Sequence, residues 1–463
     1  MRVVRVLILL VVFALIAGAC SITEDEETTT AAPETTTTAG TTPTPDDVDP
    51  SDGPIGMVIL RGSDDEKALC GYDGDELLSP ADFEDVWYVL NSHGIEVARY
   101  FNPDFPEPRE LPGSLQVFVL TDPNPDPVEA SRLLLADGIP ASPHHLVMPA
   151  DRWKFGPAFA PEEGAAGPDN YVQDAFDTDV HGAIAIVDTG SEPSPPGDWG
   201  SVWDPYLTSP VPVFTEPEPV GIAAEFVGHG VFAAGIVRRL LPGSDISIRS
   251  AMRVPSEDAG PVFSEFSVIG SIASAIGSEL AEAEGGVVNL SLGTYTCEPD
   301  QIPLGLAAYL GQVAASEADV VFVAAAGNDG IDDPESPFWP AGFSDPDLIT
   351  SRVDPWLQSL PDDHALKTGI LALLDAQTIA PIVVGVGALD ESWSNSVGAT
   401  LWAPGTDIVS TYPGGDGFAT WSGTSFAAPF VSALVAGCKG TGTYRDSLAS
   451  LISKGPDITG PTC

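Results

Sequence analysis

Apolar segments alternate with helical patterns along the second part of the chain, over residues 164–463. Nearly continuous apolar runs, of the kind that form buried strands, occur at GAIAIVDTG, DISIRSAMRV, GVVNLSLG, VVFVAAAGN and PIVVGVGAL. Helix-like stretches separate these runs, from HGVFAAGIVRRLL to SFAAPFVSALVAG. Strands that are apolar throughout are typical of a parallel sheet covered on both faces by helices. The pattern therefore predicts an α/β domain with a mostly parallel sheet between helices.

Residues 54–163 show a different pattern, in which short apolar segments lie between two helical stretches. The segments MVILRG, IEVARYF and LQVFVLT alternate with ADFEDVWYVLNSHG and DPVEASRLLLADG. This mixture predicts a small α+β domain. It contains no catalytic motif, and we expect its adjacent histidines, His144 and His145, to lie in a proline-flanked loop in structural or solvated roles.

The N-terminal segment has the pattern of an export signal followed by a tether. Two arginines precede an apolar run that extends to Ala17, and small residues lead from there to Cys20. This order predicts a secretory signal peptide over residues 1–19. Residues 20–53 are mainly Thr, Pro, Glu and Asp and predict a disordered tether. No later segment reaches the roughly 20 apolar residues of a transmembrane helix, so we expect an exported protein.

Cys20 allows two interpretations of the end of the signal. The small residues before it resemble a bacterial lipobox, in which the cysteine becomes the lipidated first residue, although Ala17 stands where that motif usually has leucine. The alternative is ordinary cleavage after Ala17-Gly18-Ala19, with Cys20 incidental. We favour lipidation at Cys20, and so expect an extracellular or cell-envelope location with a possible lipid anchor to the membrane.

Composition restricts the partners and cofactors. The 67 acidic and 18 basic residues give a formal net charge of −49, which would repel a phosphate backbone. Nucleic acid is therefore not an expected partner. The acidic side chains predict a solvated surface or, alternatively, carboxylate clusters that hold structural calcium. Because the sequence has no paired CxxC spacing and no histidine cluster, we expect no metal site and no cofactor required for chemistry.

Four cysteines remain beside Cys20, namely Cys70, Cys297, Cys438 and Cys463. An even number in an exported chain allows two disulfides. Four cysteines allow three pairings. We expect Cys438 to pair with Cys463 because the two flank the final segment.

Three short segments carry residues of hydrolytic chemistry where a strand gives way to a loop or helix. Asp188 ends the strand in AIAIVDTG, His229 begins a helix in VGHG, and Ser425 begins another in SGTSFAAP. A serine hydroxyl is a weak nucleophile, so it needs an imidazole that takes its proton and a carboxylate that orients the imidazole. Alone, each residue could be a turn or helix-cap residue. Together they predict a Ser/His/Asp triad.

The order of these residues separates the known hydrolase classes. Aspartic peptidases also carry DTG, but they need two such carboxylates, from two copies or a dimer, and this chain has no second DTG or DSG. The α/β-hydrolases place serine first, in a GxSxG elbow, whereas here serine comes last in GTSFA. The order Asp, His, Ser is that of subtilisin.

The segments IVDTG, HGVFAAG, NLSLG, AAAGN and GTSFAAP resemble the signature segments of the subtilases, the subtilisin-like serine peptidases, over about residues 180–440. This resemblance implies a subtilisin-like three-layer fold over 164–463, preceded by a propeptide-like or accessory domain over 54–163. It also implies a serine endopeptidase made as a precursor. Within it, Ser425 matches the nucleophile, His229 the general base and acid, Asp188 the residue that orients the histidine, and Asn328 the oxyanion-hole asparagine.

The resemblance also locates substrate binding. The strand that pairs with an extended peptide is matched by Ser291, Leu292 and Gly293, and the wall of the primary specificity pocket by Ala324, Ala325 and Ala326. The segment PFWPAGF resembles the floor of that pocket, where Phe338 would make the pocket shallow.

Two departures from the family pattern stand out. Val231 and Phe232 occupy positions where the family usually has a threonine and a second histidine, which puts the local support of the histidine helix in question. Residues 344–380 form an insertion with the helix-like stretch LKTGILALLDAQ, which we expect to shape access to the pocket or a partner surface.

The sequence leaves two alternative functions open. One is a catalytically silent relative that binds peptides or partners, although no triad residue and no oxyanion asparagine is missing here. The other is an acyl hydrolase that acts on esters by the same chemistry. We expect protein or peptide substrates and a monomeric enzyme.

Overall fold

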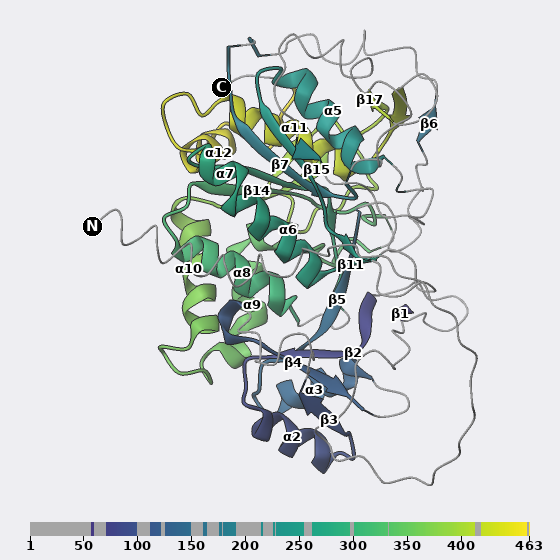
Figure 1. Ribbon diagram of the computed structural model, residues 1–463, viewed down its shortest axis with the longest axis vertical. Coiled ribbons are helices and arrows are strands. Elements are labelled where there is room, and N and C mark those ends of the chain that lie inside the picture. Colours follow the sequence, from purple (N-terminus) through teal and green to yellow (C-terminus); the bar gives the residue numbers. More distant parts are fainter. Residues whose placement is uncertain are drawn as a thin grey trace, which may run out of the picture.

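The computed structural model describes residues 57–59, 71–99, 112–121, 126–149, 161–163, 176–177, 179–190, 214–215, 226, 228–253, 262–296, 301–331, 333–412, 418–460 and 463. The predicted signal peptide and tether, with Cys20, Cys70 and Cys297, lie outside these residues. Figure 1 shows a larger part, built on a helix-covered sheet, and a smaller N-terminal part beside it. Within the described residues, no helix has both the length and the apolar character needed to cross a bilayer.

A seven-stranded sheet with the order β16-β15-β14-β12-β7-β9-β8 forms the centre of the larger part. All of its neighbouring strands are parallel. Its strands are β7 (Ala183–Asp188), β8 (Phe214–Thr215), β9 (Asp245–Ser250), β12 (Gly286–Leu290), β14 (Val320–Ala325), β15 (Val383–Ala388) and β16 (Leu401–Ala403). The four strands β7, β12, β14 and β15 are buried along their whole length, which confirms the parallel α/β sheet predicted from continuous apolar runs.

Helices cover both faces of this sheet because successive strand residues point to opposite sides. Ile184 and Ile186 of β7 pack in the core under α5 (His229–Leu240), α11 (Thr424–Gly437) and α12 (Tyr444–Ser453). Ala185 and Val187 pack on the other side. That face carries α6 (Glu265–Gly277), α7 (Glu279–Glu282), α8 (Leu304–Ala315), α9 (Pro346–Leu357) and α10 (Ala365–Ile379). Helices, sheet and helices thus form three layers, as the family resemblance implied.

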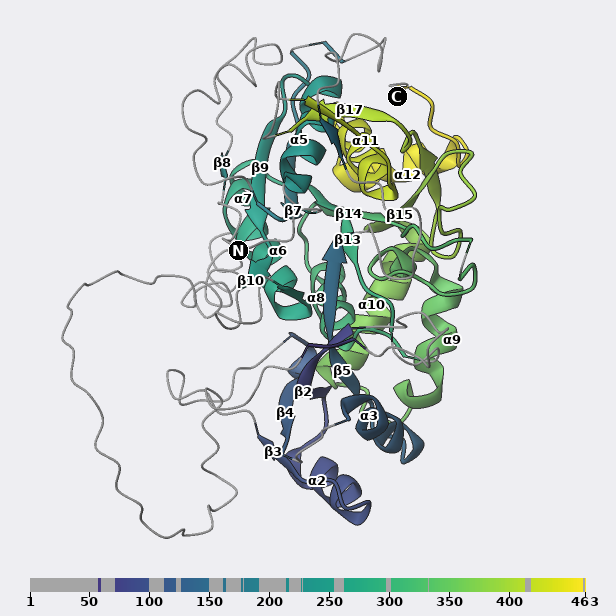
Figure 2. The ribbon, with the colours of Figure 1, turned by 90° about the vertical axis from the view of Figure 1, so that its right-hand side faces the viewer.

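An antiparallel sheet joins the N-terminal part to the larger part. Its order is β10-β11-β5-β2-β4-β3, with β1 paired to β2 and β13 paired to β5. Its strands are β1 (Met57–Ile59), β2 (Gly71–Ser79), β3 (Val97–Arg99), β4 (Gln116–Leu120), β5 (Ser142–Pro149), β10 (Met252–Arg253), β11 (Val262–Ser264) and β13 (Leu292–Gly293). Helices α2 (Phe83–Ser92) and α3 (Pro127–Ala136) pack on the N-terminal strands. Figure 2 shows β5 running from the N-terminal strands of this sheet to β13, with which it pairs.

The prediction of a loop around His144 and His145 was wrong, because both residues lie within β5 and are buried. His144 bonds through Nδ1 to Glu76 and packs on the ring of Phe266, with 4.3 Å between ring centroids. His145 faces Glu265. The prolines of SPHHLVMP bound the strand at its two ends and do not exclude it, since proline is tolerated at strand ends.

The insertion over 344–380 forms α9 and α10 after the short helix η4 (Ala341–Ser344). Helix α10 packs closely on α8, where a Cβ added to Gly311 would lie 2.5 Å from the backbone of Gly369. The insertion also reaches the N-terminal part, because Ser359 Oγ donates to the Gly138 carbonyl over 2.9 Å. A Cβ on Gly113 of η2 (Pro112–Ser114) would meet both α8 and α10.

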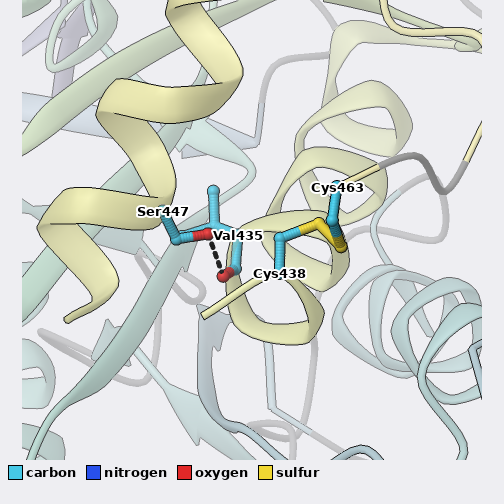
Figure 3. The surroundings of a disulfide bond; sticks show 4 residues. All are labelled: Val435, Cys438, Ser447 and Cys463. Carbon is cyan, nitrogen blue, oxygen red and sulfur yellow. Dashed lines mark hydrogen bonds between the residues drawn. A yellow bond between two sulfur atoms is a disulfide. The ribbon is translucent and has the colours of Figure 1, made fainter. Parts of the chain in front are cut away.

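The C-terminal end is closed by the disulfide between Cys438 and Cys463, whose Cα atoms lie 5.1 Å apart (Figure 3). This is the pairing expected from the sequence. Nearby, Ser447 Oγ of α12 donates to the Val435 carbonyl of α11, which joins these two helices directly (Figure 3). A third sheet combines β6 (Glu162–Glu163), β17 (Ile408–Thr411) and β18 (Phe418–Trp421).

Candidate active site

Asp188 and His229 meet at the carboxyl end of the parallel sheet. Asp188 is the last residue of β7 and His229 the first of α5, and both are fully buried. The Oδ1 atom of Asp188 lies 2.8 Å from His229 Nδ1 and accepts a second bond from the Thr189 N–H. A Cβ on Gly230 would come within 2.8 Å of the Gly190 carbonyl. Only glycine after the histidine therefore permits this close approach of helix and strand.

Aromatic rings hold the imidazole of His229 in place. Its ring centroid lies 5.4 Å from that of Trp421 and 5.3 Å from that of Phe426. Phe232 packs on both of these rings, at 5.5 and 4.6 Å. Phe232, which stands where the family usually has a second histidine, thus forms an aromatic cluster with the two rings that contact His229.

Hydroxyl groups fix the first turn of the same helix. Thr411 Oγ1 donates to the Val231 carbonyl over 3.0 Å, and Ser410 Oγ donates to the Phe232 carbonyl over 2.7 Å. The support of the histidine helix, which the sequence left in question, comes from β17 and from the aromatic cluster.

Ser425 is the second residue of α11, and the ring of the following residue packs on His229. Its hydroxyl donates to the Ser291 carbonyl over 3.1 Å, while Ser291 Oγ donates to the Ser425 carbonyl over 2.6 Å. Asn289 donates to the same Ser291 hydroxyl and accepts from Ser432, also in α11. This network ties the serine to the segment expected to bind substrate.

Asn328 presents an amide donor beside Ser425. Its Oδ1 accepts hydrogen bonds from the backbone N–H and the hydroxyl of Thr424, both at 2.9 Å. Its Nδ2 is buried and has no hydrogen-bond partner in the described part of the chain. A buried amide without a partner is costly, so a group fixed in this way is suited to a ligand that carries an acceptor.

The segment expected to bind substrate already pairs with another strand of the same chain. Leu292 and Gly293 form β13, which pairs antiparallel with Pro149 and Met148 of β5. The next residue, Thr294, exchanges two backbone hydrogen bonds with Trp339, at 2.7 and 2.8 Å. This exchange fixes the neighbouring residue Phe338.

Phe338 fills the space between the substrate strand and the end of β14. It is 1% exposed, and its ring centroid lies 5.0 Å from that of Tyr295. A Cβ on Gly293 would come within 2.4 Å of the Phe338 ring, and one on Gly327 within 3.0 Å of Phe338 Cβ. The expected pocket wall, which is buried, precedes Gly327 and consists of Ala324, Ala325 and Ala326.

Comparison with known proteins identifies the family. Residues 182–442 match the Peptidase_S8 model, described as the subtilase family. The chain is a member of the subtilase family. The family supports a serine-type peptidase, and all the triad candidates and Asn328 lie within the matched residues.

Solved subtilase-like structures resemble this chain in part. The prenylagaramide maturation protease PagA shares 20% identity, with a TM-score of 0.36 over 57% of this chain and 76% of PagA. Fervidolysin from Fervidobacterium pennivorans, a keratinolytic enzyme, shares 18%, with a TM-score of 0.45 over 83% of this chain and 57% of its own. The A-subunit of the AB5 toxin from E. coli shares 19%, with a TM-score of 0.40 over 60% and 85% of the two chains. A search of curated proteins found no match.

Behind the pocket, this subtilase has a buried polar network that the sequence did not reveal. Tyr295 donates to Asp329 over 2.9 Å and accepts from the Asn395 amide over 2.7 Å, and Asn395 Oδ1 accepts from the Asp329 N–H. Burial and, secondly, the nearby Asp329 carboxylate raise the pKa of Tyr295 well above its ordinary value. The only sequence signal was Asp329, which follows Asn328 and resembles a turn residue.

The described residues of this subtilase contain no group of three or more His, Cys, Asp or Glu side chains that could hold a metal ion. Structural calcium remains a prediction from the acidic composition alone.

Proposed function

We propose that this subtilase is an exported serine endopeptidase that hydrolyses peptide bonds through an acyl-enzyme on Ser425. The observation that carries the proposal is the buried 2.8 Å contact between Asp188 and His229, whose imidazole packs on the ring of Phe426, the residue after Ser425. Asn328, whose amide nitrogen is buried without a partner among the described residues, supports it. These are the groups that acyl transfer requires.

In the proposed mechanism, Asp188 holds the imidazole of His229 with the proton on Nδ1, which makes Nε2 the basic nitrogen. Nε2 takes the Ser425 proton as Oγ attacks the substrate carbonyl. The Asn328 amide and the Ser425 backbone N–H, at the positive end of α11, stabilise the oxyanion. His229 then protonates the leaving amine, and water hydrolyses the ester by the reverse path.

The N-terminal part gives a reason to propose a precursor. Strand β5 pairs with β13, which the family resemblance assigns to the substrate. A peptide can bind to a strand edge by backbone hydrogen bonds, but only when the edge is accessible. We therefore propose that the domain over 54–163 is a propeptide that blocks the site until it is removed.

The proposed location and partners come from the sequence. The signal peptide directs export, and lipidation at Cys20 would tether the enzyme to the cell envelope. We propose a monomeric enzyme that acts on proteins or peptides and needs no cofactor for its chemistry.

The test uses casein and a fluorophosphonate label with the wild type and Ser425→Ala. We expect the variant to lose labelling entirely and casein cleavage by several orders of magnitude, as removal of a triad residue does. A folded wild type that neither labels nor cleaves would favour the catalytically silent alternative. Turnover of ester substrates alone would favour the acyl hydrolase.

A further inference from the structure

The backbone that carries Asn328 is held on both sides by one residue, Asn395. Asn328 lies in the segment after β14, and Asn395 lies in the segment after β15, the neighbouring parallel strand. The Asn395 N–H donates to the Gly327 carbonyl over 3.0 Å, and Asn395 Oδ1 accepts from the Asp329 N–H over 2.8 Å. Asn395 therefore bonds the residues immediately before and after Asn328.

These two bonds restrict the backbone dihedral angles of Asn328. The Gly327 carbonyl belongs to the peptide unit before the Asn328 Cα, the Asp329 N–H belongs to the unit after it, and each unit is planar. With both planes held, the direction in which the Asn328 side chain leaves the backbone is set. Thr424 then bonds its Oδ1. Together these contacts determine where Nδ2, the proposed oxyanion donor, points.

The side chain of Asn395 is oriented in turn by Tyr295. Asn395 Nδ2 donates to the Tyr295 hydroxyl over 2.7 Å, and this hydroxyl donates to Asp329 Oδ2 over 2.9 Å. All three residues are buried. A flipped Asn395 amide would place its NH2 group against the Asp329 N–H, so that two donors would face each other. The network therefore permits one orientation of this amide.

The two segments pack too closely for the Asn328 loop to shift toward its support. A Cβ on Gly327, whose φ is +98°, would lie 2.8 Å from Asn395 Nδ2. One on Gly330 would lie 2.3 Å from the Ser394 carbonyl oxygen. The Gly330 N–H also donates to the Trp393 carbonyl over 2.9 Å. Residues 327–330 thus lie directly on residues 393–395.

We propose that Asn395 is a positioning residue, which acts on the transition state through Asn328, and that Tyr295 keeps the Asn395 amide in the orientation that this role requires. The proposal rests on the proposed function and adds to it two residues that contact neither the substrate nor the oxyanion. A misplacement of about 1 Å can cost about 100-fold in rate. Loss of the support should therefore lower kcat and leave KM nearly unchanged.

The first experiment is a double-mutant cycle on cleavage of a peptide substrate, with rates expressed per active site counted by complete fluorophosphonate labelling. We expect Asn395→Ala to lower kcat by about 10- to 100-fold, with KM within about twofold of the wild type. In the Asn328→Ala background, the same change should cost less than about twofold, because the donor that Asn395 positions is already absent. A structural role alone would give equal losses in both backgrounds.

Gln377→Ala is the matched control. Gln377 is also a buried amide that holds backbone, because its Oε1 accepts from the N–H groups of Ile382 and Val383 and its Nε2 donates to the Val383 carbonyl. These bonds lie at the opposite end of β15 from Asn395. We expect this variant to lose stability and to keep the kcat of the wild type. A loss of kcat as large as that of Asn395→Ala would overturn the proposal.

Tyr295→Phe decides the question if Asn395→Ala does not fold, because it keeps the ring that packs on Phe338. We expect kcat to fall by about 2- to 10-fold, as for loss of one neutral hydrogen bond, and to be unaffected by the same change in the Asn328→Ala background. Unchanged kcat, equal losses in both backgrounds, or a loss confined to KM overturns the inference and leaves the proposed function intact. A wild type that neither labels nor cleaves overturns both.

Discussion

The carboxyl end of the sheet, called the catalytic end because it carries the proposed triad, and the junction with the N-terminal part are both buried and polar, but they are built differently. At the catalytic end, Asp188 Oδ1, Asn328 Oδ1 and the Ser291 carbonyl oxygen each accept hydrogen bonds from neighbouring residues, while Asp188 Oδ2 and Asn328 Nδ2 have no partner within the described residues. At the junction, His145 and Glu265 face each other at 3.7 Å, which is beyond hydrogen-bond distance. Neither side chain makes a hydrogen bond through its polar side-chain atoms within the described residues.

This difference separates contacts that the proposed active site needs from contacts that only join the two parts of the chain. The hydrogen bonds accepted by Asp188 Oδ1 and Asn328 Oδ1 fix these side chains, and a preorganised donor such as the Asn328 amide avoids reorganisation during a reaction. The junction combines a poorly satisfied polar pair with apolar residues such as Leu115, which is buried in the core that also contains residues of α8 and α10. A poorly satisfied buried pair contributes little net stability. A junction of this kind is compatible with the proposal that the domain over 54–163 is removed.

The largest effect that would test this comparison is expected at Asn328. Replacement by Ala removes the one amide donor at the catalytic end that has no partner among the described residues. We expect kcat to fall by about 10² to 10³ with little change in KM, as for loss of one oxyanion donor. Thr424→Ser, which keeps the hydroxyl that bonds Asn328, is the matched control. Unchanged kcat in Asn328→Ala would show that this amide does not contact the transition state.

A change of intermediate size is expected at the junction, measured in the Ser425→Ala background so that the chain stays whole. His145→Ala should lower the free energy of unfolding by about 3 kcal/mol, because it leaves the Glu265 carboxylate buried beside a cavity. The exposed His93→Ala is the control and should be neutral. Changing both partners to Leu should recover much of the loss, since a buried pair is often replaceable by apolar side chains. Failure of the double variant to recover would mean that this pair stabilises the junction.

The sequence predicted the elements and site residues that depend on local signals. Continuous apolar runs located β7 and β14, and the residues at their ends located Asp188 and Asn328. The glycine after His229 is required by the close approach of α5 to the strand end. These features can be predicted from the sequence because each depends on a pattern of only a few consecutive residues.

The features that the sequence did not reveal depend on pairs of residues that lie far apart along the chain. Nothing near His145 indicates that β5 pairs with β13 and faces Glu265, since both partners are more than a hundred residues away. The bond between Tyr295 and Asn395 joins positions separated by 100 residues. The contact of Ser359 with Gly138 spans 221. Tertiary packing brings these residues together, and no local pattern in a single sequence predicts such long-range contacts.

The smallest effect is expected at Tyr295, where Phe keeps the ring against Phe338 but removes the hydroxyl that bonds Asp329. We expect a loss of about 1 kcal/mol in the free energy of unfolding near neutral pH. Burial raises the pKa of Tyr295 above its ordinary value of 10.0, so its neutral form is favoured in the folded state. That contribution is complete below pH 10 and is lost as pH rises further. The difference between wild type and Tyr295→Phe should therefore shrink above about pH 10 in denaturant titrations. A constant difference across that range would show that Tyr295 ionises as readily in the folded chain as in the unfolded one.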